Sequence, residues 1–306
     1  MSENTNTTKR RSAIQIMGSL IGLVKPLLHI MLAAIILGTL GYLCAIFLTI
    51  LAGQVIMHGL LTGVAGMIVP VDNMWRVFTP VKTIITVMIV IAVLRGILHY
   101  VEQYCNHFIA FKLLAIIRHK VFAALRKLCP AKLEGRDKGN LISIITTDIE
   151  LLEVFYAHTI SPIAIATLTS IIMVIFIGRY HWLAGVIALV AYLIVGVVIP
   201  MWNGKRGSQK GMEFRTNFGE LNSFVLDSLR GLDETIQYGQ GEKRKEQMSE
   251  HSKNLAGMQE SLSKMEGSQR SFTNMVILLA SFGMLALTIW LYAKGEVGFE
   301  GILTCT

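Results

Sequence analysis

Charged side chains are scarce in this sequence: Asp, Glu, Lys and Arg make up only 16% of its 306 residues, whereas 53% are hydrophobic. Ordinary soluble domains carry about 25% charged residues. Several apolar runs reach the ~20 residues that cross the ~30 Å hydrocarbon core of a bilayer. The alternating pattern of barrel strands is missing. The composition therefore excludes an ordinary soluble domain and predicts an all-α, polytopic membrane protein.

The motifs of several common site types are also missing. The four cysteines lie far apart, at Cys44, Cys105, Cys129 and Cys305. No C-x-x-C spacing occurs, so neither a disulfide framework nor a zinc site is indicated. The sequence has no G-x-x-x-x-G-K followed by Ser or Thr, the loop that binds nucleotide phosphates in P-loop proteins. We therefore expect that this chain does not hydrolyse ATP by itself. No cleavage site follows the polar N-terminal tail, so a signal peptide is not expected.

Basic residues outnumber acidic ones and give a net charge of +8, but their distribution is uneven. Most of the 28 Lys and Arg residues lie in three segments: the N-terminus up to Lys25, residues 112–138 and residues 205–270. Cytoplasmic loops of membrane proteins carry such an excess of Lys and Arg. We therefore expect the N-terminus and both other basic segments in the cytoplasm, and the charge indicates no nucleic-acid partner.

Five apolar runs are long enough to cross a membrane. They cover residues 27–56, 81–98, 161–177, 183–201 and 272–293. A sixth run begins near the end of the chain, so residues 27–306 are predicted to form one transmembrane domain. Residues 1–26 are predicted to be a cytoplasmic tail and a short interfacial helix. The alternative is that this helix only lengthens the first span.

The second apolar run continues without a break into a basic, mostly polar segment. From Val81 to Leu128 there is no proline and a single glycine, Gly96. A helix over this stretch would be about 72 Å long at ~1.5 Å per residue, and the bilayer core takes ~30 Å of it. About 40 Å must therefore extend into the cytoplasm. Residues 99–160 and 202–271 are predicted to form two cytoplasmic hairpins; a soluble coiled coil is the alternative for their polar halves.

Polar side chains gather where this helix leaves its apolar run. Arg95, His99 and Glu102 recur at i, i+4 and i+7, so they share one helix face, and Tyr100 and Gln103 lie on a neighbouring face. Ionisable groups in or near a span are costly and usually face protein or water. Our interpretation is a polar wall of a substrate cavity. The alternative is an intrahelical ion pair in which Arg95 and Glu102 only neutralise each other.

His107 lies farther along the same helix, about 39 Å from Val81 at ~1.5 Å per residue, which places it near the cytoplasmic interface. One hypothesis is that its imidazole is an axial haem ligand, with Tyr100 or Tyr104 beside the ring. The alternative is that His107 is an interfacial or hydrogen-bonded residue without a ligand.

Two long hairpins on five spans and the start of a sixth resemble the transmembrane domain of an ABC exporter. The resemblance covers nearly the whole chain. It implies that Mg-ATP is hydrolysed by an ATP-binding domain, which lies on another chain or is missing from a truncated one. It also implies alternating access of the spans, with the hairpin tips as coupling segments that contact this domain. The tip residues are Gly139, Asn140 and Leu141 in the first hairpin, and Gly231, Leu232, Asp233, Glu234 and Tyr238 in the second.

The order of several motifs further resembles the CydC half of the bacterial CydDC-type heterodimer. That family is described as exporting cysteine and glutathione, and it is also linked to haem handling and to assembly of cytochrome bd. The chain departs from its pattern at Gln103, where the family often has Arg, which argues against a haem contact there. The matching positions are Arg95, His99, Tyr100, Glu102, His107, Phe111, Leu114, Arg118, Phe122, Leu125, Pro130, Gly139, Asn140, Leu141, Asp148, Tyr156, Ser161, Pro162 and the second tip, 231–239.

This resemblance implies a multi-pass protein of the bacterial plasma membrane with a cytoplasmic N-terminus. Its expected partners are the lipid bilayer, an ABC ATP-binding domain, a second and non-identical half-transporter, and a small-molecule substrate such as a thiol. Two alternatives are a haem-binding or haem-transporting subunit and an exporter of another small molecule or peptide. A receptor or scaffold is less favoured, because it has no need of ~40 Å extensions on the same side.

Overall fold

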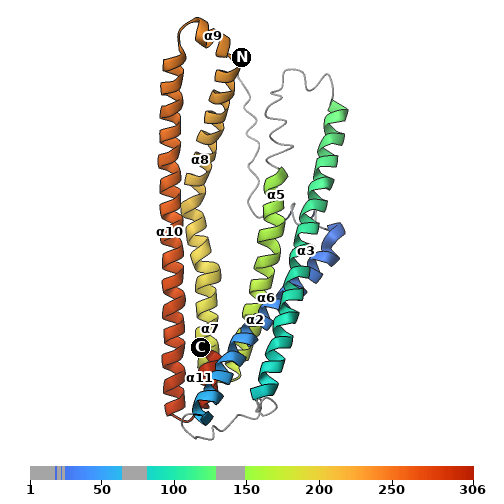
Figure 1. The fold of residues 1–306 in the computed structure, drawn as a ribbon, viewed down its shortest axis with the longest axis vertical. Coiled ribbons are helices and arrows are strands. Elements are labelled where there is room, and N and C mark those ends of the chain that lie inside the picture. The colour runs from blue at the N-terminus through green and yellow to red at the C-terminus, as the bar shows by residue number, and fades with distance from the viewer. Residues whose placement is uncertain (1–17, 19–21, 23–24, 64–80, 129–148) are drawn as a thin grey trace, which may run out of the picture. The chain divides into compact units, whose positions relative to one another are not determined.

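The described part of the chain is entirely helical in its regular structure, as the sequence predicts (Figure 1). It forms two compact units, one ending at Met173 and the other beginning at Val174. The computed structural model describes residues 18, 22, 25–63, 81–128 and 149–306.

Five helical segments of the described chain are long and apolar enough to cross a membrane. They are Lys25–Ile56, Lys82–Leu128, Tyr156–Gly178, Trp182–Arg230 and Gly241–Ala293. In the second of them only 6% of the most apolar stretch is buried inside the protein. A soluble protein would bury such residues in a core, whereas spans expose them to lipid. The five predicted spans are thus confirmed as helices of sufficient length and apolarity.

In the first unit, the single turn η1 (Lys25–Leu27) leads into α2 (Leu28–Gly63), which packs antiparallel to α3 (Val81–Leu128). α3 runs unbroken for 48 residues. This confirms the single long helix predicted from the absence of proline. Ile89 and Val93 on its outer surface are each about 60% exposed, which suits a face that meets lipid.

The chain returns along α3 as one rod of α5 (Ile149–Phe155), the π-helical turn η4 (Tyr156–Ile160) and α6 (Ser161–Gly178). Both α5 and η4 pack on α3. Arg118 of α3 donates a hydrogen bond from Nη2 to Oε1 of Glu150 on α5 at 3.3 Å. The two legs of the first hairpin are therefore in direct contact where they are described.

A small apolar core joins three segments of the first unit. It contains Leu27 of η1, Ile109 and Leu113 of α3, and Tyr156 of η4, all of them buried. Leu27 stands at the start of the apolar run of α2. Its contact with this part of α3 shows that residues 99–109 lie beside α2 rather than beyond it.

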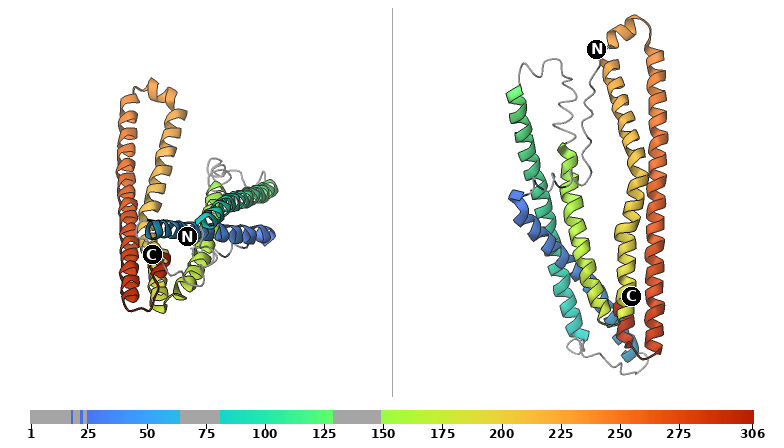
Figure 2. Two further views of the ribbon diagram at one scale, coloured as in Figure 1. Left: turned by 60° about the horizontal axis from the view of Figure 1, so that its bottom comes forward. Right: turned by 180° about the vertical axis from the view of Figure 1, so that it is seen from behind.

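In the second unit, α7 (Trp182–Leu193), the π-helical turn η5 (Ile194–Val198) and α8 (Ile199–Arg230) form one rod. The helix α10 (Gly241–Ala293) runs back beside α8 as a single helix of 53 residues. The short helix α9 (Leu232–Gln237) joins them at one end (Figures 1 and 2). α8, α9 and α10 thus form a helical hairpin, and the residues predicted for its tip lie in and beside α9.

Two turns meet at the opposite end of this unit. Beyond α10, Gly295 adopts a left-handed φ of 75°, and the chain then enters α11 (Phe299–Cys305), where the sixth apolar run begins. The His181 ring accepts a hydrogen bond at Nδ1 from the backbone N–H of Leu183 at 3.2 Å. Its Nε2 lies 3.1 Å from Oε2 of Glu296. This pair connects the turn before α7 to the turn after α10.

Two predicted segments fall outside the described residues. The tail and interfacial helix expected in residues 1–26 lie almost entirely there. The first coupling segment, with Gly139, Asn140 and Leu141, lies there as well.

Candidate functional site

A buried carboxylate lies where α2, α3 and α6 meet. Glu102 of α3 is only 2% exposed. It faces Gly38 of α2, because a Cβ on that glycine would lie 3.0 Å from Cγ of Glu102. The same Cβ would also collide with the Ile165 side chain of α6. The glycine is therefore what allows the two helices to close over the carboxylate.

Three neighbours on α3 satisfy this carboxylate. His99 Nδ1 lies 3.2 Å from Oε2, and Gln103 Nε2 donates to the same oxygen at 3.0 Å. Asn106 Nδ2 donates to Oε1 at 2.5 Å. A buried charge persists only with such partners. Glu102, His99, Gln103 and Asn106 are called the carboxylate cluster below.

The predicted alternative of an Arg95–Glu102 ion pair is not what the structure shows. Among the described residues, the basic partner of Glu102 is His99, three positions away, and both carboxylate oxygens are already engaged. Residues three or four apart on a helix are neighbours, whereas Arg95 lies seven positions and about 10 Å along the axis from Glu102.

Asn106 is a member of the carboxylate cluster that the sequence prediction missed. It is 2% exposed, and its Oδ1 is buried without a hydrogen-bond partner among the described residues. Its spacing of four from Glu102 on a continuous helix was the available signal. Such an unsatisfied buried oxygen calls for a donor from water or a ligand.

Arg95 and His99 line a small pocket between α2 and α3, called the α2–α3 pocket below. Its volume is about 180 Å³. The residues that line it are Gly38, Gly41, Tyr42, Ala45, Arg95 and His99. Tyr100, also predicted for the site, is 71% exposed and does not line this pocket. The structure thus brings Arg95, His99 and Glu102 to one region, with Gln103 contributing through Glu102.

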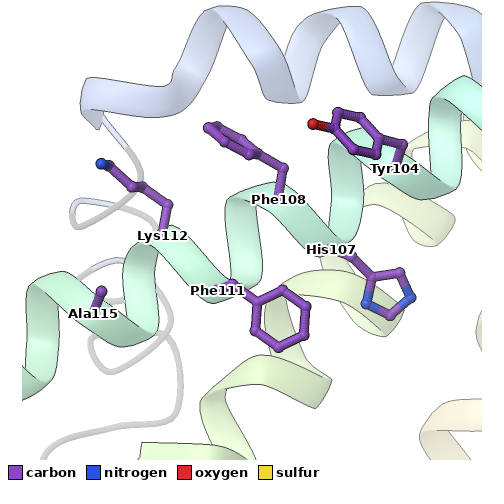
Figure 3. A pocket seen from close by; sticks show the side chains of 6 residues that line it. All are labelled: Tyr104, His107, Phe108, Phe111, Lys112 and Ala115. Atoms are coloured by element: carbon purple, nitrogen blue, oxygen red, sulfur yellow. The ribbon is translucent and has the colours of Figure 1, made fainter.

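His107 lines a second pocket, of about 440 Å³, farther along α3 (Figure 3). Tyr104 and Phe108 project to one side of the helix, and His107 and Phe111 project to another. Tyr104 stacks on Phe108, with ring centroids 6.4 Å apart. Tyr104 thus lines the same pocket as His107 but stacks on Phe108 rather than on the imidazole.

The ring neighbours of His107 include Phe111 and a second imidazole. The rings of His107 and His158 lie 5.7 Å apart between centroids and meet edge to face. His158 belongs to the π-helical turn η4, and such turns occur frequently at functional sites. Sequence spacing gave no signal for this pair, because it arises from packing between distant segments. No group of three or more metal-ligating side chains occurs in the described residues.

The second predicted coupling segment forms the short helix α9. Its apolar side chains point outward: Ile236 is 68% exposed and Tyr238 is 74% exposed. Asp233 and Glu234 lie in its first turn. The end of the polar hairpin thus exposes both apolar and acidic side chains.

Backbone geometry defines this tip at both ends. The N–H of Gly231 donates to the carbonyl of Asp227 at 2.9 Å and closes α8. The hydroxyl of Thr235 donates to the carbonyl of Gly231 at 2.7 Å. Gly239 leaves α9 with a φ of 63°, a conformation that favours glycine. The tip is thus an ordered turn that hydrogen bonds and a left-handed glycine define.

Comparison with known proteins gives a consistent picture. The family model described as ABC transporter transmembrane region matches residues 27–306. A probable ABC transporter ATP-binding/permease protein of Haemophilus influenzae is 38% identical over 297 residues, which is 96% of this chain and 51% of that protein. The ATP-dependent lipid A-core flippase of Escherichia coli (strain K12) is 26% identical over 210 residues, 68% of this chain and 34% of the flippase. The chain thus spans about half the length of the first relative and less of the second. With a match over residues 27–306, five helices able to span a membrane and a long helical hairpin ending in a short exposed helix, the chain belongs to the ABC transporter transmembrane region family.

Proposed function

We propose that this chain is the permease part of an ATP-driven exporter in the plasma membrane of a bacterium, with its N-terminus in the cytoplasm. An ATP-binding domain uses Mg-ATP, and the spans carry a small molecule across by alternating access. The observation that carries this proposal is the carboxylate cluster, a hydrogen-bonded polar group held beside the apolar helix α2.

The depth of the carboxylate cluster follows from the contacts of α2. The helix α2 starts at Leu28, next to Leu27, which belongs to the same apolar core as Ile109, and Glu102 lies opposite Gly38. This is about 15 Å into the helix at ~1.5 Å per residue, close to the middle of a ~30 Å hydrocarbon core. The second span then extends to about residue 109, beyond the predicted end at residue 98.

A polar cluster at this depth needs a functional reason. A charged side chain at the centre of a bilayer costs about 2.5–3.5 kcal/mol on insertion scales, and such residues usually line substrate or ion pathways. Glu102 satisfies its own charge on α3, yet Arg95 and His99 remain directed into the α2–α3 pocket. A substrate-binding wall explains why charged groups lie here.

The α9 tip supports coupling to an ATP-binding domain. A hairpin that exposes Leu232, Ile236 and Tyr238 at its end would bury these side chains in a partner surface. Asp233 and Glu234 add negative charges that basic residues of such a partner can complement. The domain boundaries, a tail over 1–26 and a transmembrane domain over 27–306, are part of this proposal.

The order of the CydC-like motifs supports a thiol such as cysteine or glutathione as the substrate and a second, non-identical half as the partner. Isolation of the chain with candidate partner halves in mild detergent tests the pairing. A homodimer that is fully active in transport would contradict it. The likeness to lipid A-core flippases supports instead an amphiphilic substrate.

The transport proposal is tested in inverted membrane vesicles that contain the transporter with this chain. ATP-dependent accumulation of labelled glutathione or cysteine is measured for wild type and for Glu102→Gln. We expect about tenfold slower transport in the variant, because hydrogen bonds to a charged group contribute about 1.5–3 kcal/mol. Glu260→Gln, which alters an exposed ion pair with Lys264, is the control. Equal transport rates in both variants would show that the carboxylate cluster takes no part in transport.

Haem handling is the second candidate function, and the His107 site is the observation that favours it. An imidazole at the edge of an aromatic pocket suits haem iron, and Lys112 in the same pocket offers a cation to a propionate. Purified protein mixed with haem should show a shifted Soret band that weakens in His107→Ala. The band should also fade on acidification, because only an unprotonated nitrogen ligates iron. Identical spectra for the two proteins would exclude His107 as a ligand.

A further inference from the structure

Arg95 is a permanently charged side chain left without a counter-charge in the described part of the chain. The oxygens of Glu102 are engaged by the other members of the carboxylate cluster. Around Arg95, α3 exposes apolar side chains such as Leu94 and Ile97. Arg95 is itself exposed on this surface and contacts no carboxylate of the described residues, so a counter-charge must come from outside this part of the chain.

The depth of Arg95 makes this need acute. A Cβ on Gly41 would lie 3.6 Å from Cβ of Leu98, so these residues share one level of the α2–α3 pair. Gly41 lies about 20 Å along α2 from Leu28 at ~1.5 Å per residue. His99, next to Leu98, thus lies about 20 Å into a hydrocarbon core of ~30 Å, and Arg95, three residues before Leu98 on α3, lies about 5 Å closer to its far side. A charge at this depth is costly unless it faces protein, water or an opposite charge.

The α2–α3 pocket offers donors rather than acceptor carboxylates. Gly38, Gly41 and Ala45 provide a floor without bulky side chains. Arg95 and the His99 ring line its walls together with Tyr42. Glu102 holds His99 through Nδ1, which fixes the ring and leaves Nε2 for another partner. Guanidinium, imidazole and phenol groups that line one pocket can donate hydrogen bonds to the oxygens of an anion.

We infer that the α2–α3 pocket is an anion-binding subsite for the transported molecule, with Arg95 as its charged anchor and His99 and Tyr42 as supporting donors. The inference rests on the proposed transport function and narrows its substrate to molecules with a carboxylate or a phosphate group. A guanidinium binds either group through two parallel hydrogen bonds. A soluble peptide or amino acid and a lipid headgroup are the two sources of such a group.

The test measures binding without ATP or transport. The full chain in lipid nanodiscs is titrated with reduced glutathione by calorimetry, and retained phosphatidylglycerol is quantified by native mass spectrometry. We expect at least one probe to bind wild type and to bind Arg95→Gln about tenfold more weakly, because charge-assisted hydrogen bonds are lost. Lys82→Gln removes a charge from the same helix outside the pocket and should change nothing. Arg95→Lys should bind the probe with intermediate affinity, because it keeps the charge but loses the two parallel hydrogen bonds of a guanidinium.

A second variant separates pocket occupancy from charge. Gly41→Val fills the floor of the pocket and should weaken the same probe while it leaves Arg95 in place. Gly53→Val is its matched control on α2, because no heavy atom of the described residues lies within 4 Å of a Cβ at that position. An effect on glutathione alone identifies a soluble substrate, and an effect on phosphatidylglycerol alone identifies a lipid headgroup.

Three results would overturn the subsite: no probe binds wild type, Arg95→Gln binds as wild type does, or Arg95→Gln only loosens the association with a partner half. The last result would mean that a carboxylate of that half neutralises Arg95. Binding that depends on Arg95 in a protein without transport would reject the proposed function but keep the subsite. Transport with binding independent of Arg95 would reject the subsite alone.

Discussion

At Glu102 and its neighbours, residue spacing determines which side chains share a helix face, and tertiary packing determines which of them are in contact. Helical periodicity placed Arg95, His99 and Glu102 on one face, and the structure brings them to one region. It could not reveal which base the carboxylate contacts, because that depends on side-chain reach and on the helix packed opposite. Nor could it reveal His158 next to His107, since these residues meet only through the fold.

Removal of the buried carboxylate should destabilise the protein. Glu102→Ala leaves the amides of Gln103 and Asn106 without their acceptor, and an unpaired buried donor costs about 1–3 kcal/mol. We expect a lower unfolding temperature in detergent, followed by tryptophan fluorescence. Glu260→Ala breaks only an exposed pair and should change stability by less than about 0.5 kcal/mol. Equal melting of both variants would contradict the buried network.

The close approach of α2 to α3 and α6 should depend on Gly38. Gly38→Ala places a methyl group against Ile165 and within 3.0 Å of Glu102 Cγ. Overpacking of this kind costs typically about 1–3 kcal/mol. Gly53→Ala, on the same helix with open space, should be neutral or stabilising by up to about 1 kcal/mol, because alanine favours a helix. Thermal unfolding of the pair gives the comparison, and a stable Gly38→Ala protein would contradict the packing.

At the level of helices and hairpins, the long elements were predictable and their interruptions were not. Absence of proline predicted α3, and continuity of apolar and polar segments predicted the α8–α10 hairpin. The π-helical turns η4 and η5 carry no such signal, because their extra residue is accommodated by packing. Where the second span ends within α3 stays a prediction, because continuity of the helix does not mark the boundary between lipid and water.

The α9 tip gives a prediction about coupling. Asp233→Lys combined with Glu234→Lys reverses the charge of its first turn without burying anything, so folding should be unaffected. In a complete transporter we expect substrate-stimulated ATPase activity to fall severalfold while expression stays near normal. Glu246→Lys on the exposed start of α10 is the control. If coupling survives in the double variant, the ATP-binding domain docks elsewhere.

For the whole molecule, the family is established, whereas its orientation in the membrane is open to a direct test. In a background without cysteine, Ser249→Cys on the polar part of α10 should react with an impermeant maleimide only in inside-out vesicles. Glu296→Cys, after the apolar end of α10, should react only from the other side. The reason is the excess of Lys and Arg in residues 205–270. The reverse labelling pattern would overturn the proposed cytoplasmic hairpins.

The length of α10 has a mechanical consequence. Its 53 residues form one helix about 80 Å long at ~1.5 Å per residue, and its sequence contains no proline at which it could kink. A stiff rod of this length is a lever arm: a tilt of about 5° at one end displaces the other by about 7 Å. A small change in tilt at the membrane end of α10 thus produces a large displacement of α9. Conversely, a displacement of α9 produces a small change in the tilt of the apolar part of α10.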